Sequence, residues 1–470
     1  MSLATLSDRS LSQVRAGTAP KRVAIIGADF VPSSLPPALR IKFFATHLRE
    51  FGWEPVVVTT DPCYYENRVD PENASLLPEG LQVIRTAAWP ARLTRRFGVG
   101  DLGMRSLWHH WQALKKLCRE QPVDLIFIPV PPYVSMVLGR LAYRKFRIPY
   151  VIDYIDPWGT PYYWKLPRSQ RPPKWPLASA MARVLEPFAL RQVAHVVGVS
   201  KGTTDFVVGK YPWLRESDAT EIPYGGEPRD WEYARRHTRL NPIFDPSDGL
   251  LHVSYVGRGG ADMIPALGAV FSAVKEGLRT NPEIFGRLRL HFVGTAYGPD
   301  GQGKEQVSPL ARQAGIDALV EEHPGRVVYL DAMQVLSDSH ALLVVGSEQP
   351  HYTASKIFPY ILACKPLLAV FHRSSSVVGI LRETGAADPV TFGEQDRLPE
   401  KVQEIAVRLG QLLSFPPGFR PATRWQAFEA YTTHAMTARL AEVFDRAVKR
   451  QTPTAREGGP LLASPSEARR

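Results

Sequence analysis

The stretch HYTASKIFPYILACKPLLAV, residues 351–370, decides the fold that the sequence predicts. A hydroxyl of Thr353 or Ser355 can cap a helix, in which apolar residues then recur every three or four positions. Pro366 stops that helix, and residues 367–371 are typical of a strand buried on both faces. A helix, a tight turn and a buried strand make one step of an α/β protein with a parallel sheet.

Lys356 stands at the start of this helix, where the partial positive charge of the helix N-terminus makes a cation unfavourable. A bound anion would remove that penalty, so the position indicates a phosphate contact. A solvated lysine on an ordinary capping turn explains this segment equally well.

The same alternation of strands and helices extends along most of the chain and predicts two parallel-sheet domains. A length of 470 residues also favours two domains. The expected strands of the first domain are 22–28, 55–60, 81–86, 124–130, 149–155 and 195–200. Those of the second are 251–257, 288–294, 326–331, 340–346 and 366–371. Both sheets are expected to direct the carboxyl ends of their strands, where ligands bind, to a cleft between the domains.

The domain boundaries follow from changes in this pattern. Residues 1–20 and 451–470 are polar and are expected to be disordered tails. The segment 225–249 lacks a regular apolar period and is interpreted as the connection between domains. The expected units are therefore 21–235, 236–424 and a long closing helix at 425–450.

The loop after the first strand, residues 27–40, contains one glycine and three prolines. A classical dinucleotide site needs several glycines there, so the loop argues against an NAD(P) dehydrogenase. We expect it to form the wall of an acceptor pocket, with Ser33, Ser34 and Arg40 on that side. Serines in such loops more often only cap turns.

The loop after the first strand of the second domain is different. Gly257, Gly259 and Gly260 allow a ligand to approach the backbone closely, and Arg258 can grip a phosphate with two N–H donors. We expect Arg258 and Lys356 to hold one diphosphate from two sides. The alternative is a glycine-rich turn with a surface arginine.

The net charge of +11 indicates an anionic partner. Between Arg85 and Glu120, eight basic residues stand against two acidic ones and alternate with aromatic residues, and Tyr162–Trp175 is similar. Such a pattern favours contact with an anionic membrane surface, although a solvated basic face is the alternative. We expect no nucleic-acid partner, because no recognised motif accompanies the charge.

The three cysteines lack metal-site spacing, and no secretory signal or membrane span is evident, so a cytoplasmic location is predicted.

Five segments taken in order resemble the retaining GT-B glycosyltransferases of the family-4 type. They are PPALRIKFFATHLREFGWEPVVVTT (36–60), PYVIDYIDPWG (149–159), HVVGVSKGTTDFV (195–207), IPYGGEP (222–228) and YTASKIFPYILACKPLLAV (352–370). The resemblance covers roughly Lys21 to Lys449. It implies two Rossmann-like domains facing a cleft, the first binding an acceptor and the second a nucleotide sugar, with the C-terminal helix packing back towards the first domain.

The resemblance also implies an activity: transfer of a sugar from a nucleotide diphosphate sugar to a lipid-linked or polysaccharide acceptor, with retention of configuration. Arg258 and Lys356 would stabilise the leaving diphosphate, so neither a metal nor a cofactor is expected. Asp156 would orient the acceptor hydroxyl or the donor sugar, or serves only as an Asp-Pro turn residue. The expected location is peripheral, on the inner face of the plasma membrane.

The sequence departs from the family pattern at the expected ribose contact. Pro359 occupies the position of the usual carboxylate, and His351 that of its partner glutamate, so Glu348 is the candidate substitute. His351, Thr353 and Ser355 complete the expected donor-binding group. Two alternatives stay open: a catalytically silent protein that binds nucleotide or glycan or supports a partner enzyme, and a nucleotide-sugar epimerase on the same fold.

Overall fold

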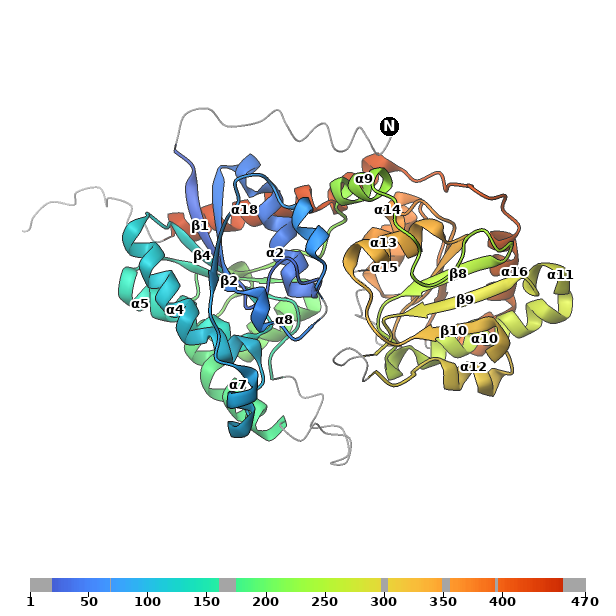
Figure 1. Cartoon of the computed structure of the whole chain (residues 1–470), viewed down its shortest axis with the longest axis horizontal. Coiled ribbons are helices and arrows are strands. Elements are labelled where there is room, and N and C mark those ends of the chain that lie inside the picture. Colours follow the sequence, from blue (N-terminus) through green and yellow to red (C-terminus); the bar gives the residue numbers. More distant parts are fainter. Residues whose placement is uncertain are drawn as a thin grey trace, which may run out of the picture.

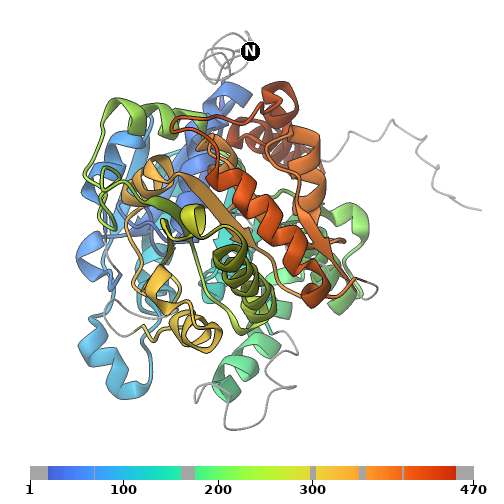
Figure 2. The same ribbon diagram turned by 90° about the vertical axis from the view of Figure 1, so that its right-hand side faces the viewer.

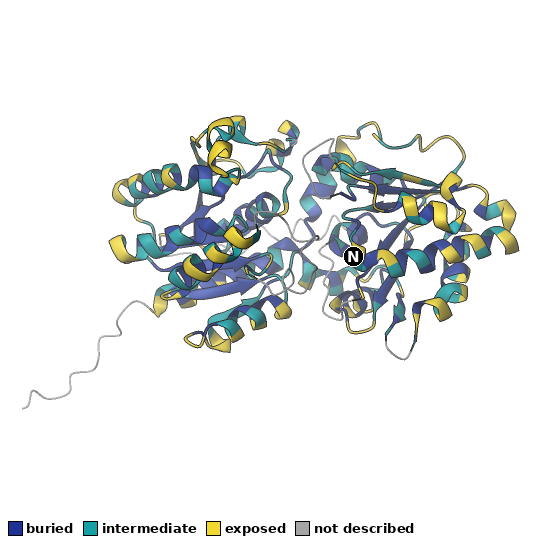
Figure 3. Ribbon diagram, turned by 90° about the horizontal axis from the view of Figure 1, so that it is seen from below, coloured by how far each residue is buried: buried dark blue, intermediate teal, exposed yellow. Residues whose placement is uncertain are grey.

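The computed structural model describes residues 19–67, 69–159, 175–296, 303–348, 356–393 and 396–450. These residues form two α/β domains, each with one parallel sheet between layers of helices, as the sequence predicts (Figure 1). In each domain the buried strands lie between helices that expose only their outer faces (Figure 3).

The first domain contains seven strands in the order β3-β2-β1-β4-β5-β6-β7, paired in parallel throughout. They are β1 (Lys21–Ile26), β2 (Trp53–Thr60), β3 (Gln82–Thr86), β4 (Leu125–Val130), β5 (Tyr150–Tyr154), β6 (His195–Gly198) and β7 (Ala219–Glu221). Its helices are α2 (Pro36–His47), α3 (Ala91–Thr94), α4 (Leu102–Glu120), α5 (Val137–Phe146), α7 (Trp175–Leu190) and α8 (Lys201–Lys210). The central strand β4 is apolar over its whole length because helices cover both of its faces.

The second domain contains six parallel strands in the order β10-β9-β8-β11-β12-β13. They are β8 (Leu251–Val256), β9 (Leu288–Val293), β10 (Val320–His323), β11 (Ala341–Val345), β12 (Leu367–His372) and β13 (Val390–Phe392). Its helices are α10 (Ile264–Thr280), α11 (Pro282–Phe285), α12 (Ser308–Ala314), α13 (Tyr329–Asp338), α14 (Ile357–Leu362), α15 (Ser376–Thr384) and α16 (Val402–Leu413). Helices α10 and α16 pack side by side on one face of this sheet, which is turned towards the viewer in Figure 2.

The strand expected at 326–331 is wrong. Residues 329–338 form α13, whose buried side chains Leu330, Met333 and Leu336 recur every three residues. The apolar run at the start of this helix is too short to distinguish a strand from a helix by its period. The strand is instead β10, whose sequence VEEH shows little apolar character because it lies at the sheet edge and pairs only with β9.

Two connections also differ from the expectation. The segment 225–249 contains a helix, α9 (Pro228–Arg236), which buries Trp231. The expected single closing helix is two helices, α17 (Trp425–Phe428) and α18 (Thr433–Lys449). They separate at Thr432, whose backbone is extended (ψ 155°) and whose hydroxyl accepts a hydrogen bond from the Ala435 N–H.

Helix α18 packs back onto the first domain, as predicted. It lies against α2 (Figure 1). Its residues Met436, Leu440 and Phe444 belong to the core beneath β1 and β4. The Phe444 ring contacts the rings of Trp53 and Phe127 edge-on, with centroids 5.2 Å away in both cases. Helix α18 is therefore part of the first domain, although it follows the second domain in the sequence.

Candidate functional site

The glycine-rich loop after β8 runs beneath the side chain of Lys356. The Gly257 N–H donates to the Val293 oxygen at 2.7 Å, and the Gly259 N–H donates to the Thr295 oxygen at 2.8 Å. Gly257 has φ +150°, and a Cβ placed there would lie 1.7 Å from the Lys356 Nζ. Only glycine leaves the space that the lysine uses.

Lys356 immediately precedes α14 and reaches back over the end of β8. Its Nζ donates to the Tyr255 hydroxyl at 3.2 Å and lies 4.8 Å from the centre of that ring. Burial, together with the charges of Arg258 and Arg326, lowers the pKa of Lys356 to about 7. Among the described residues, no carboxylate forms a salt bridge with this lysine. An anion bound here would supply the missing counter-charge.

Arg258 is held in place by its neighbour in the loop. Its two terminal nitrogens lie 3.0 and 2.9 Å from the two carboxylate oxygens of Asp262. The backbone oxygen of Asp262 accepts a hydrogen bond from the Glu348 N–H at 3.3 Å, which brings the exposed Glu348 to the same edge of the sheet. Gly260 leaves room for the ion pair, because a Cβ there would lie 2.2 Å from Asp262 Oδ1.

Arg326 is a third cation of this group, and our sequence reasoning missed it. It is exposed and follows β10, in the loop before α13, and its charge acts on Lys356. The sequence places Arg326 inside the strand expected at 326–331, where a basic residue does not indicate a ligand site. Only the true position of β10 puts it at the carboxyl end of the sheet.

Tyr360 explains how α14 is positioned. Its hydroxyl accepts a hydrogen bond from the Val256 N–H at 2.7 Å and donates to the Val256 oxygen at 3.3 Å. These bonds tie α14 to the last residue of β8, directly before Gly257. Pro359 precedes Tyr360, so the helix offers no carboxylate at that position.

Asp156 approaches this group from the first domain. It follows β5 and is exposed. Desolvation by the surrounding protein raises the pKa of its carboxyl, and the charge of Arg258 opposes that rise. The strand ends of the two domains therefore bring a carboxylate and a guanidinium within electrostatic range of each other.

The expected acceptor-side residues lie in different environments. Ser33 is fully buried, and its hydroxyl donates to Asp29 at 2.8 Å. Arg40 is 1% exposed and binds both oxygens of Asp153, at 2.5 and 2.8 Å. Ser34 lies between the domains, where its hydroxyl accepts from the Tyr329 N–H at 3.3 Å. The structure thus places Ser33 and Arg40 in the protein interior, and Ser34 at a domain contact.

Three expected donor-binding residues, His351, Thr353 and Ser355, lie outside the described residues. Asp29 is an acidic residue that our sequence reasoning missed. It lies three residues after the end of β1, and burial raises its pKa despite the hydrogen bond from Ser33. Nothing in its sequence surroundings distinguishes it from an ordinary turn residue.

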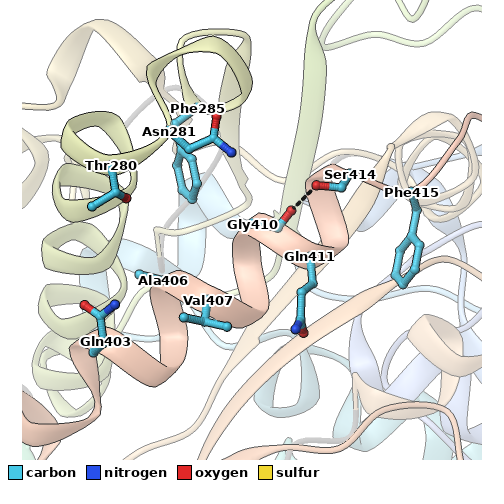
Figure 4. Close-up of a pocket in the computed structure, with 10 residues that line it drawn as sticks. All are labelled: Thr280, Asn281, Phe285, Gln403, Ala406, Val407, Gly410, Gln411, Ser414 and Phe415. Atoms are coloured by element: carbon cyan, nitrogen blue, oxygen red, sulfur yellow. Dashed lines mark hydrogen bonds between the residues drawn. The ribbon is translucent and has the colours of Figure 1, made fainter.

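A surface pocket of the second domain lies elsewhere, between α10, α11 and α16 (Figure 4). Thr280, Phe285 and Gln411 are among its lining residues. Thr280 ends α10, whereas Arg258 precedes its beginning, and a helix of this length separates the two by about 25 Å. The pocket is therefore separate from the group of cations.

In the described part of the chain, no helix combines the length and apolar character that crossing a membrane requires.

Comparisons with known proteins agree with this architecture. Residues 38–225 match the family model of the glycosyl transferase 4-like domain. No curated protein matches the chain. HepE of Anabaena, solved in complex with UDP and glucose, is 14% identical with a TM-score of 0.56, over 90% of this chain and 99% of that one. The α,α-trehalose 6-phosphate synthase of Burkholderia multivorans is 13% identical with a TM-score of 0.58, over 94% and 100%.

A glycosyltransferase of Rickettsia africae is 11% identical with a TM-score of 0.55, over 92% of this chain and 100% of that one. At these identities the likeness establishes the arrangement of the two domains and not the substrates. The chain therefore has the GT-B fold, and residues 38–225 of its first domain are similar to the glycosyl transferase 4-like domain.

Proposed function

We propose that this protein is a retaining glycosyltransferase that moves a sugar from a nucleotide diphosphate sugar to a lipid-linked or polysaccharide acceptor. The observation that carries the proposal is the meeting of Arg258, Lys356 and Arg326 at the carboxyl ends of β8 and β10. Asp156 faces them from the first domain. Asp262 pairs with Arg258, and an anion that binds among the three cations would offset the repulsion that remains.

The chemistry of the leaving group fits these cations. A departing nucleoside diphosphate gains negative charge in the transition state, and preorganised cations stabilise that charge. Arg258 presents a planar fork fixed by Asp262, and Lys356 becomes fully charged when phosphate approaches. We infer that these residues replace a metal ion at the diphosphate, and that the reaction continues in the presence of a chelator.

The remaining residues have proposed roles on either side of the diphosphate. Asp156 contacts the donor sugar or the acceptor hydroxyl, because it is the carboxylate that approaches Arg258 from the acceptor domain. Glu348 contacts the ribose in place of the carboxylate that the family pattern has where Pro359 stands. Its backbone N–H is hydrogen-bonded to Asp262, which belongs to the loop after β8. The solved complexes of Anabaena HepE contain UDP and UDP-glucose, so UDP is the first nucleotide to test.

The experiment is a thermal shift of the full chain with UDP, GDP, ADP, dTDP and CMP, with NAD as control, followed by turnover of the matching nucleotide sugar with membranes. A ligand at about 100 times its Kd raises stability by about 2.7 kcal/mol. Arg258→Ala and Lys356→Ala should each remove the shift. Arg312→Ala is the control, because this exposed arginine of α12 is paired with Glu305 instead. Retained diphosphate affinity in both test variants would contradict the proposed site.

A second candidate function rests on Pro359. Its position in α14 leaves the helix without the carboxylate that the family pattern places there. A catalytically silent protein that binds nucleotide or supports a partner enzyme would show a thermal shift but no turnover with any donor in the presence of membranes.

The proposed acceptor is lipid-linked because aromatic and basic residues gather on the surface of the first domain. Trp89, Phe97 and Trp108 are 53%, 86% and 57% exposed. The rings of both tryptophans contact His109 edge-on, at 5.5 and 5.0 Å, so they form one continuous surface. Exposed aromatic rings beside arginines are typical of proteins that lie on an anionic bilayer. We therefore propose a peripheral location on the inner face of the plasma membrane. The second stretch of this kind, Tyr162–Trp175, lies almost wholly outside the described residues.

A further inference from the structure

One face of the second sheet carries a group of histidines. Alternate residues of a strand point to opposite faces, and Val253 and Leu290 point towards α10 and α16. The intervening residues His252 of β8 and His291 of β9 therefore point to the other face, together with Glu321 and His323 of the edge strand β10. Glu321 pairs directly with His291 in the strand register.

Three of these side chains converge on one point. The His291 Nδ1 lies 3.4 Å from Glu321 Oε2, and the His323 Nε2 lies 3.9 Å from the same oxygen. All three atoms lie within 4.8 Å of one another. The His291 side chain is 1% exposed, whereas Glu321 and His323 are 53% and 39% exposed, so the point is open to solvent from one side.

A chain of hydrogen bonds determines which nitrogen of His291 carries a proton. Asp248 Oδ1 accepts from the His252 Nε2 at 2.9 Å, so a neutral His252 has a lone pair on Nδ1. That lone pair lies 2.9 Å from the His291 Nε2, which must therefore be the donor. The His291 Nδ1 is then left with a lone pair directed at a carboxylate.

Two acceptors that face each other without a hydrogen atom repel. The buried atoms His291 Nδ1 and His323 Nε2 have no hydrogen-bond partner among the described residues. A proton on the His252–His291 pair would relieve the repulsion, but the 3.4 Å contact with Glu321 lacks hydrogen-bond geometry. A cation between the three atoms would be coordinated by the two nitrogens that have no hydrogen-bond partner and by the carboxylate.

We propose that His291 Nδ1, Glu321 and His323 Nε2 bind a divalent transition-metal ion of the zinc class, with water at the remaining positions. Two imidazoles and one carboxylate form a ligand set that suits this class of metal. The second nitrogen of His291 bonds to His252, and His252 bonds to Asp248, which is how outer residues orient a histidine ligand. Phe244 stacks on both buried rings, at 4.2 and 4.7 Å, and fixes their planes.

The ion would join the edge strand to the rest of the sheet. His323 ends β10, and its backbone oxygen accepts from the Gly294 N–H at 2.8 Å. The loop that carries Arg326 begins directly afterwards. The proposed ion is thus structural, belongs to a sheet face and not to the phosphate loop, and does not depend on the proposed transferase activity.

The test is a titration of the chelator-treated full chain with Co²⁺, followed by visible absorption, and with Zn²⁺, followed by calorimetry. We expect one Co²⁺ per chain with the absorption of nitrogen and oxygen ligands, and a higher Tm with Zn²⁺. Glu321→Gln and His323→Gln should each weaken binding at least tenfold, since removal of even an outer partner costs 10–100-fold. Both side chains are partly exposed, so these variants are expected to fold.

His237→Gln is the matched control, because His237 is exposed and lies outside the group. It should bind Co²⁺ like the unaltered chain. His252→Gln should weaken binding about tenfold through the orientation of His291, with the metal-free Tm as its folding control. Absence of Co²⁺ binding in the unaltered chain, or equal affinities in Glu321→Gln, His323→Gln and His237→Gln, would overturn the proposal.

Discussion

Lys356 shows how one residue can be prepared for an anion. Burial and two neighbouring arginines lower its pKa to about 7, so without ligand it is largely neutral above that pH. A bound diphosphate favours the charged form and raises the pKa again. In the proposed site, the lysine would couple phosphate binding to the uptake of a proton.

We predict that UDP binding takes up a proton near about pH 8 and weakens as the pH rises from about 7 to 9. The measurement is calorimetry in buffers of different ionisation enthalpy. Lys356→Met should bind more weakly and lose the dependence on buffer. Lys275→Met, an exposed lysine of α10, should retain both. Binding without proton exchange in the unaltered chain would contradict this assignment.

Residue type and position indicated Arg258 with its glycines, because they follow a strand, and Lys356, because it stands at the start of a helix. It did not indicate the buried ion pairs. Arg40 and Asp153 are 113 positions apart, and only the fold brings them together. A basic residue in a loop looks the same in sequence whether it meets a ligand or a buried carboxylate.

At the scale of an element, the loop after β8 requires glycine at position 257. Gly257 combines φ +150° with the space occupied by Lys356. Gly268 in α10 is the opposite case, since a Cβ there meets nothing within 4 Å.

We predict that Gly257→Ala displaces the lysine and lowers affinity for nucleoside diphosphate at least tenfold. Gly268→Ala should retain the affinity and raise stability by about 0.5–1 kcal/mol, as expected for a helix interior. Parallel calorimetry and urea unfolding check both. Unchanged UDP affinity in Gly257→Ala would show that the position of the lysine does not matter.

Element prediction succeeded where strands are buried on both faces, as in β1, β4 and β12. It failed at β10 and α13. An edge strand with one apolar residue in four carries no period, and the apolar run at 327–330 leads into the first turn of α13, which begins at Tyr329. The missed strand also hid Arg326, so an error in one element became an error in the site.

At the scale of the whole molecule, the chain passes between the domains twice, and the two passages are bonded to each other. The Gly226 N–H donates to the Tyr431 oxygen and the Thr433 N–H to the Gly226 oxygen, both at 2.9 Å. Glu227, which precedes α9, and Thr433, which begins α18, meet His47 of α2 at this junction. Glu227 lies 2.7 Å from the His47 Nε2.

The junction should depend on pH. Burial lowers the pKa of His47, but Glu227 and Glu50 outweigh this and raise it to about 9. The stabilisation is therefore complete below about pH 6.5, the usual value, and is lost as the pH rises through 9. We predict that the free energy of unfolding falls over this range by up to about 3 kcal/mol.

Chemical unfolding at several pH values tests this prediction. His47→Gln should be less stable at pH 6 and should lose this part of the pH dependence, whereas His372→Gln, at the end of β12, should retain it. Equal slopes in the unaltered chain and His47→Gln would remove the role of the junction.

We predict that the aromatic surface of the first domain, which includes Trp89, Phe97 and Trp108, binds to an anionic membrane. Phe97→Ser with Trp108→Ser should reduce co-sedimentation with vesicles containing anionic lipid at least tenfold, because exposed rings insert at headgroup depth. Leu240→Ser is the control, as Leu240 is 94% exposed in the segment between α9 and β8. Equal binding of both variants would place membrane contact elsewhere or exclude it.

The return of α18 to the first domain has a consequence for biosynthesis. Domains generally fold as they leave the ribosome, the N-terminal one first. Here the apolar surface beneath β1 and β4 is covered by Met436, Leu440 and Phe444, which are translated only after the whole second domain. The nascent first domain must therefore expose that surface until α18 has been synthesised. A stop codon within the second domain would therefore leave the first domain incomplete as well.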